Sequence, residues 1–528
     1  MNKLELVKQS IHMDRKKCVA GTQITLENDV NIPDNKPDAE SVVLNKGAIV
    51  ITDSKSSDNH VLVKGKLQFS LLIQSDMGGL YSVKGEIPFE EQVYMEGVVS
   101  TDSVDIVSSL EDMSVDLINS RKLSVQAVAG FKLCADAIWD EDMVTGIMVN
   151  EETDGAVECN RKKRDIAQIA IQKKDIFRMK EELELPQNYP NITELIWYDV
   201  QLLNVEFKLL EEKLTVQGSA QIFLIYESEG EEGRIRTYET TIPFGGTIDC
   251  YGCKEIMVPA IRFEVGTENM EVRPDFDGEA RVVGLELTLN MDIKMYEEEH
   301  MEYVDDAYGI EKEIELARKD SVYKKMLLCN NDKLKISGKL EAPKVSDGIL
   351  QILHSDAAIQ MDEIRQEEEK IIAEGAIRLQ VLLSTGESER PYTKAEGYLP
   401  FTYEAELPAH KDKCSYELQP VLSTLMISLS GSGDIETKAV LLFNLLVFED
   451  LNMPGITEMR VWDADQERRS RLPGIVGYMV QEGDELWEIG KRYYVPVSQI
   501  LEFNNLSGES VRAGDKLLIV RQGRTKAD

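Results

Sequence analysis

Residues 61–89, VLVKGKLQFSLLIQSDMGGLYSVKGEIPF, set out a pattern that the chain repeats twice more. The second copy is LTVQGSAQIFLIYESEGEEGRIRTYETTIPF (214–244) and the third is IIAEGAIRLQVLLSTGESERPYTKAEGYLPF (371–401). Three landmarks recur 153 to 157 residues apart: a glycine (Gly65, Gly218, Gly375), the proline of a Pro-Phe pair (Pro88, Pro243, Pro400) and an upstream proline (Pro33, Pro186, Pro343). Solenoid units are much shorter than this, so the spacing predicts three related domains in tandem.

Each copy has the apolar pattern of β-strands. Val61, Val63, Leu67 and Phe69 alternate around Gly65, which is typical of strands with one buried face. A polar loop of variable length follows, and a second strand then runs into the Pro-Phe pair, as in a hairpin. A glycine at the same place in every copy predicts a β-bulge or the close approach of another backbone.

The second half of each copy is rich in alternating β-branched residues. The fold class is therefore predicted to be mainly β, with three tandem β-sandwich-like repeat domains followed by a small α+β (βααβ) module. Short segments after the upstream prolines have an apolar spacing that suits one or two helical turns; they are residues 39–45, 192–198 and 347–354. The predicted boundaries are 1–155, 156–308 and 309–452 for the repeats, 453–474 for a linker, 475–521 for the small module and 522–528 for a tail.

The composition narrows the possible partners and the compartment. The chain has 528 residues and a formal net charge of −36, a field that repels nucleic acid and anionic membranes. Its first residues lack the apolar core of a secretory signal, and no segment is apolar enough to span a bilayer. Seven sparse cysteines are typical of a reducing compartment. We therefore expect a cytoplasmic protein with neither nucleic-acid binding nor membrane insertion.

Residues 475–521 have a different pattern, with the order strand–helix–helix–strand. Asp484 stands where a helix N-cap is wanted, and Ser498 can cap the second helix. The motifs Y-x-V (478–480), G-D-x-L-W-x-I (483–489) and A-G-D-K-L-L-I (513–519) resemble those of the LysM domain.

The resemblance to LysM implies a shallow groove that binds glycans containing N-acetylglucosamine, formed by residues 483–487 and 504–508. Glu485 stands where a Thr or Ser is common, which removes a hydroxyl and adds a charge. A protein-binding role, glycan binding and a purely structural cap are all open interpretations, and Trp487 can be either an exposed anchor or part of the core. The predicted partner- or glycan-binding residues are Gly483, Asp484, Glu485, Leu486, Trp487, Asn504, Asn505 and Leu506.

The combination of three β-rich repeats with a LysM-like module resembles the SipL family of spore coat morphogenetic proteins. The repeats resemble the SPOCS domain, with proline pairs at Pro33 and Pro37 and at Pro186 and Pro190; the third copy lacks the second proline. This resemblance implies a mother-cell protein at the forespore surface. It also implies that the LysM docks onto the coat-basement ATPase, stage IV sporulation protein A, and that other coat proteins are partners.

Catalytic and metal-binding chemistry has little support in the sequence. Cys250 and Cys253 form a C-x-x-C, but no second pair completes a zinc site, so incidental reduced cysteines are the favoured interpretation. The five histidines are scattered, and no Walker loop, G-x-S-x-G or H-E-x-x-H occurs. We expect a non-enzymatic sporulation assembly protein without a cofactor or metal. The alternatives are a peptidoglycan-binding protein that acts through its LysM and a LysM-targeted peptidoglycan hydrolase.

Overall fold

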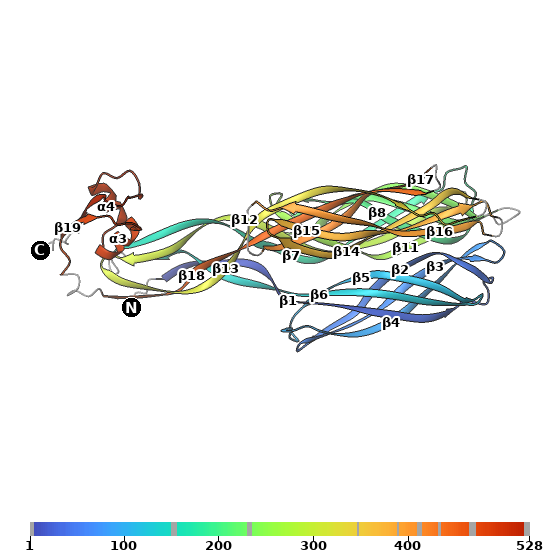
Figure 1. Cartoon of the computed structure of the whole chain (residues 1–528), viewed down its shortest axis with the longest axis horizontal. Helices are drawn as coiled ribbons and strands as arrows, with labels where there is room; N and C mark the ends of the chain where they lie inside the picture. The colour runs from blue at the N-terminus through green and yellow to red at the C-terminus, as the bar shows by residue number, and fades with distance from the viewer. Residues whose placement is uncertain are drawn as a thin grey trace.

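The computed structural model describes residues 5–148, 156–229, 235–345, 348–387, 390–408, 414–430, 434–463 and 471–521. Within them each repeat contributes six long strands, and a small βααβ unit follows (Figure 1). In repeat 1 these are β1 (Glu5–Asn31), β2 (Ala39–Ser57), β3 (His60–Ser75), β4 (Leu80–Tyr94), β5 (Val104–Asn119) and β6 (Lys122–Met148). In repeat 2 they are β7 (Val157–Glu184), β8 (Ile192–Leu210), β9 (Lys213–Ser228), β10 (Ile235–Asp249), β11 (Val258–Pro274) and β12 (Ala280–Gly309). In repeat 3 they are β13 (Lys312–Leu340), β14 (Ile349–Glu367), β15 (Lys370–Thr385), β16 (Tyr392–Glu406), β17 (Cys414–Leu429) and β18 (Ile435–Asp463).

Each repeat is a pair of three-stranded antiparallel sheets. The middle hairpin strands form one sheet, in the order β2-β3-β4 in repeat 1, and the first, last and fifth strands form the other, in the order β1-β6-β5. The same two orders recur in repeats 2 and 3. Apolar side chains from both sheets of repeat 1, such as Leu71 and Leu123, bury against one another. The mainly β, sandwich-like fold class is therefore confirmed.

The expected helical turns after the upstream prolines are wrong, because these segments begin strands β2, β8 and β14. A β-bulge explains why the apolar spacing of these segments resembles that of a helix. The strand register shifts between Val42 and Leu44, and at the equivalent places in the other two repeats. As a result the adjacent residues Val43 and Leu44 are both buried. Two neighbouring buried apolar residues imitate helical spacing, although the backbone is extended.

The repeated glycine has one of the two roles predicted for it, the close approach of another backbone. Gly65 pairs directly with Phe89 across β3 and β4, and the Phe89 ring folds over the glycine. A Cβ at Gly65 would lie 2.6 Å from Phe89 Cζ and 2.6 Å from the carbonyl oxygen of Val50. The same ring and carbonyl contacts occur at the glycines of repeats 2 and 3, Gly218 and Gly375. The glycine and the phenylalanine of the Pro-Phe pair are thus partners in one contact.

Gly218→Ala is expected to destabilise the three-repeat body by about 1–3 kcal/mol, because the new methyl group overpacks a site with no room. An added Cβ would lie 2.7 Å from Phe244 Cζ and 3.2 Å from the Leu203 carbonyl oxygen. The measurement is urea unfolding followed by tryptophan fluorescence. Gly21→Ala is the control, since its Cβ meets only the Phe131 carbonyl oxygen at 3.8 Å. Equal stability of the two variants would contradict this account.

The three repeats pack around a common axis. Residues at equivalent positions of the repeats meet there in sets of three. Leu72, Ile225 and Leu382 form one such set and are fully buried in a single cluster. Further sets lie in two other clusters; they are Met13, Ile166 and Tyr323, and Val144, Val304 and Ile456. The chain is therefore a trimer of domains built within one polypeptide.

The first and last strands of each repeat, in chain order, extend along the axis beyond the sandwiches (Figure 1). β1, β6, β7, β12, β13 and β18 are 27 to 30 residues long, whereas the other strands of the repeats have 15 to 19 residues. Their far ends form a narrow stalk of three antiparallel strand pairs, β1–β6, β7–β12 and β13–β18, with the βααβ unit at its tip (Figure 1). β18 runs to Asp463, into the range predicted as a linker; residues 464–470 and the predicted tail, 522–528, lie outside the described residues.

Equivalent residues on the axis differ in charge. Lys46, Asp199 and Asp356 occupy the same position of the three repeats, and Lys46 Nζ lies 2.5 Å from Asp199 Oδ1. The other Asp199 oxygen lies 3.1 Å from His354 Nε2. Burial alone would raise the pKa of Asp199, but Lys46 and His354 hold it well below its ordinary value. Burial, with the neighbouring Asp199 charge, raises the pKa of Asp356. The contacts therefore distinguish the repeats, although their backbones match.

Ile225→Ala is expected to cost about 2–5 kcal/mol and to weaken all three repeats together, because the cavity opens on the shared axis. Hydrogen exchange read by mass spectrometry checks this, with β3, β9 and β15 losing protection in parallel. Loss of protection confined to repeat 2 would mean that the repeats unfold independently. Ile176→Ala, at a residue that is 50% exposed, is the control.

Candidate functional site

The small C-terminal unit has its own apolar core. It consists of β19 (Ile475–Met479), α3 (Leu486–Tyr493), α4 (Val497–Phe503) and β20 (Lys516–Val520), with β19 and β20 antiparallel. Leu486 and Ile489 are spaced to share one face of α3, and both are buried. Tyr494 ends α3 in the left-handed conformation at φ 57°, and Pro496 precedes α4. This βααβ order is the one predicted for the module.

The first predicted loop is held by Asp484. Its Oδ2 accepts hydrogen bonds from the Tyr478 hydroxyl at 2.6 Å and from the Gln481 amide at 2.8 Å. These two bonds lower the pKa of Asp484. The expected N-cap role is wrong, because the cap position of α3 is Glu485, in extended conformation and with no side-chain cap hydrogen bond. Gly483, at φ +87°, makes the preceding turn possible.

The second predicted loop is tied to β20 by Asn504. The Asn504 amide donates to the carbonyl of Leu518 at 2.9 Å, and its oxygen accepts from the Leu518 N–H at 2.6 Å. Asn505, at φ 53°, is exposed beside it. Ser498 is not a cap, because Pro496 holds the cap position of α4, again without a side-chain hydrogen bond.

The eight predicted site residues therefore fall into three groups. Leu486 is only 1% exposed and belongs to the core, and Trp487 and Leu506 pack against that same core. The side chains of Asp484 and Asn504 form hydrogen bonds within the unit. Gly483, Glu485 and Asn505 are exposed. Of the predicted set, these three are therefore the residues most open to solvent.

Trp487 makes a contact that the sequence did not indicate. Its Nε1 donates to Asp306 Oδ2 at 2.8 Å, and its ring meets the ring of Tyr308 edge-on, with centroids 4.8 Å apart. Lys491, one turn further along α3, also bonds Asp306 Oδ2, at 2.6 Å. Asp306 and Tyr308 lie at the end of β12, on the stalk. Trp487, one of the predicted groove residues, is thus packed against the stalk of the same chain.

The joint between the stalk and the βααβ unit is completed by a buried hydrogen bond. The hydroxyl of Tyr308 donates to the carbonyl of Val495 at 2.8 Å, and Gly490 leaves room for it, because a Cβ there would lie 2.6 Å from that hydroxyl. Burial alone would raise the pKa of Asp306, but the bonds from Lys491 and Trp487 lower it. Tyr308 differs from its equivalents in the other repeats, Met148 and Arg460. That difference is the signal in the sequence that could have indicated this joint.

Tyr308→Ala is expected to free the βααβ unit from the stalk without unfolding it, because the lost ring belongs to the stalk. The joint should lose about 3 kcal/mol, the typical cost of removing a buried aromatic ring. Small-angle X-ray scattering would report a broader distribution of shapes, while the melting temperature of the unit stays unchanged. The equivalent Met148→Ala, at a 57% exposed position, is the control. An unchanged scattering profile would contradict the prediction.

Other groups weighed from the sequence lie apart from this unit. Cys250 and Cys253 are both buried, at a turn in which the Cys253 N–H donates to the Cys250 carbonyl at 3.0 Å. Burial raises the pKa of the Cys253 thiol to about 11. In the described part of the chain, no cluster of three or more His, Cys, Asp or Glu side chains is arranged to hold a metal ion. None of the helices there is long and apolar enough to cross a bilayer.

Comparison with known families matches both kinds of module. The family model "SipL, SPOCS domain" matches residues 38–118, 191–274 and 348–430, and the LysM domain model matches 478–520. No curated protein and no solved structure matches the chain. The chain thus carries three SPOCS domains of SipL, as predicted from the repeats, followed by a LysM domain. Both are non-catalytic binding domains.

Proposed function

We propose that this chain, with its three SPOCS domains and its LysM domain, is a non-enzymatic assembly protein of the spore coat. In this proposal it works in the mother-cell cytoplasm, and its LysM docks it onto stage IV sporulation protein A at the forespore surface. The SPOCS body then receives further coat proteins. The domain set supports the coat role.

The position of the LysM is the observation that carries the docking proposal. The stalk holds the domain away from the three sandwiches (Figure 1), so a large partner can approach its outer side without meeting them. The contacts of Asp306 and Tyr308 fix its orientation. A docking module fixed in orientation loses less freedom on binding than a tethered one, which favours affinity.

The exposed loop residues favour a protein partner over a glycan. Gly483, Glu485 and Asn505 are exposed on the two loops, while Trp487 is engaged with the stalk. A carboxylate at Glu485 complements a basic protein surface better than a neutral sugar. We therefore assign docking to the edge of the groove around Glu485 and Asn505, and a supporting role to Trp487.

Glu485→Lys and Asn505→Ala are expected to weaken capture of purified stage IV sporulation protein A by about tenfold each, because a charge is reversed and an amide is lost at the contact. Biolayer interferometry with the full-length chain is the measurement. The melting temperature of the LysM should stay within about a degree of the parent, because both side chains are exposed. Glu502→Lys, a charge reversal on the exposed side of α4, is the matched control.

Folded variants that bind the ATPase as well as the parent would remove this surface from the proposal. Saturable binding of N-acetylglucosamine oligomers by the parent, lost in Asn505→Ala, would instead make glycan binding the function of the LysM.

A further inference from the structure

The seam between repeats 1 and 2 is closed by ion pairs. Asp105 on β5 of repeat 1 bonds Lys174 on β7 and lies 3.9 Å from Arg262 Nη2 on β11. Lys174, Asp292 and Arg262 stand side by side across three strands of repeat 2, because Asp292 pairs with both of the others. This row of charged side chains faces the neighbouring repeat.

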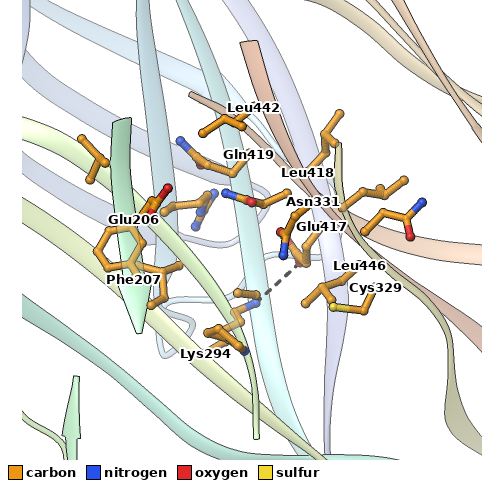
Figure 2. Close-up of a pocket in the computed structure, with 18 of the residues that line it drawn as sticks. Glu206, Phe207, Lys294, Cys329, Asn331, Glu417, Leu418, Gln419, Leu442 and Leu446 are labelled. Carbon is orange, nitrogen blue, oxygen red and sulfur yellow. Dashed lines mark ion pairs between the residues drawn. The ribbon is translucent and has the colours of Figure 1, made fainter. Parts of the chain in front are cut away.

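In the equivalent seam between repeats 2 and 3, uncharged residues stand at the positions that correspond to these charges. At the repeat spacing, Ala260 replaces Asp105, Asn331 replaces Lys174 and Gln419 replaces Arg262. The row across the strands of repeat 3 is Asn331, Asn444 and Gln419, all three of them amides. Loss of the ion pairs leaves a pocket of about 380 Å³ lined by these residues (Figure 2). A volume of this size falls within the range of small-molecule sites.

The charged groups around the pocket are mostly neutralised by one another. Lys294 at the inner end of the pocket is only 5% exposed. Its Nζ lies 2.7 Å from a carboxylate oxygen of Asp136 and 3.9 Å from one of Glu417. Figure 2 shows the ion pair of Lys294 with Glu417. Arg262 lies 2.6 Å from Asp292. The remaining charged side chains in the wall, Glu206 and Lys333, are of opposite sign. A charged ligand would therefore give up its hydration without gaining a counter-charge.

The amide row and the apolar wall are suited to a neutral ligand with many hydroxyls. Each amide offers an N–H donor and a carbonyl acceptor close together, which matches neighbouring hydroxyl groups. No side-chain hydrogen bond of Asn331, Asn444 or Gln419 to another residue is present in the described parts of the chain. Phe207 lies across the pocket from Asn331 (Figure 2) and offers an apolar face to the C–H side of a sugar ring.

We propose that this seam pocket binds a neutral carbohydrate of about disaccharide size. The site is independent of the LysM groove, because it lies among the sandwiches and its lining residues come from β8, β11, β12, β13, β17 and β18. It gives the SPOCS body a small-molecule site in addition to any protein contacts.

The test is isothermal titration calorimetry of the full-length chain with maltose, cellobiose, trehalose and N,N′-diacetylchitobiose as probes. Saturable binding of at least one of them is expected. The triple variant Ala260→Asp, Asn331→Lys, Gln419→Arg copies the side chains of the repeat 1–2 seam, so it should close the pocket. It should weaken that binding at least tenfold without lowering the melting temperature.

Gln419→Ala keeps the pocket open and removes one amide, so it should weaken binding about tenfold even if the triple variant does not fold. Gln68→Ala, which removes an exposed amide from repeat 1, should bind as the parent does. Absence of saturable binding of all four sugars by the parent would overturn the proposal. Parent-like binding by the folded triple variant, or by Gln419→Ala, would also overturn it, because the sugar would then occupy another site.

Discussion

The shared axis of the three repeats is the constraint on which the rest of the structure depends. Leu72, Ile225 and Leu382 are buried against one another, and a repeat that left the axis would expose its member of every such set. Burial of apolar side chains is the main favourable term in folding, so the sandwiches gain stability from one another as well as from their own cores. The stalk follows from the same rule, because its three antiparallel strand pairs pack around Val144, Val304 and Ile456. The LysM then sits where the stalk ends.

The architecture of one repeat could be predicted from the sequence, and the packing of the repeats could not. The close approach of another backbone at Gly218 was predictable, because all three copies preserve the glycine, but its contact with the Phe244 ring was not predicted. The segment around Val43 and Leu44 misled the prediction, because a bulge buries neighbouring residues as a helix would. Spacing reveals how many copies exist but not which faces they share. The charges of Lys46 and Asp199 give no hint of the axis until the two residues are seen in contact.

Part of the candidate site could likewise be predicted from the sequence, and part could not. The order of the LysM elements and the loop positions were predictable, because local motifs set them. The role of Trp487 was not, because its partner Asp306 is 181 residues away and belongs to a different domain. Helical spacing alone likewise could not show whether Leu486 is buried or exposed. In a short helix, that depends on which other part of the fold covers each side chain. Position within the fold, and not residue type, decided which loop residues stayed exposed.

Joining three SPOCS domains in one chain has a consequence for valency. A threefold assembly of separate chains would carry its appendage in triplicate, once for each subunit. Here a single polypeptide supplies all three subunits, and one LysM is matched along it. The three repeats bury a shared core as a trimer would, while the tip of the stalk carries the matched LysM domain. Under the proposed docking, each molecule would be released from its anchor by breaking one contact, and the density of bodies on the forespore surface would equal the density of occupied anchors.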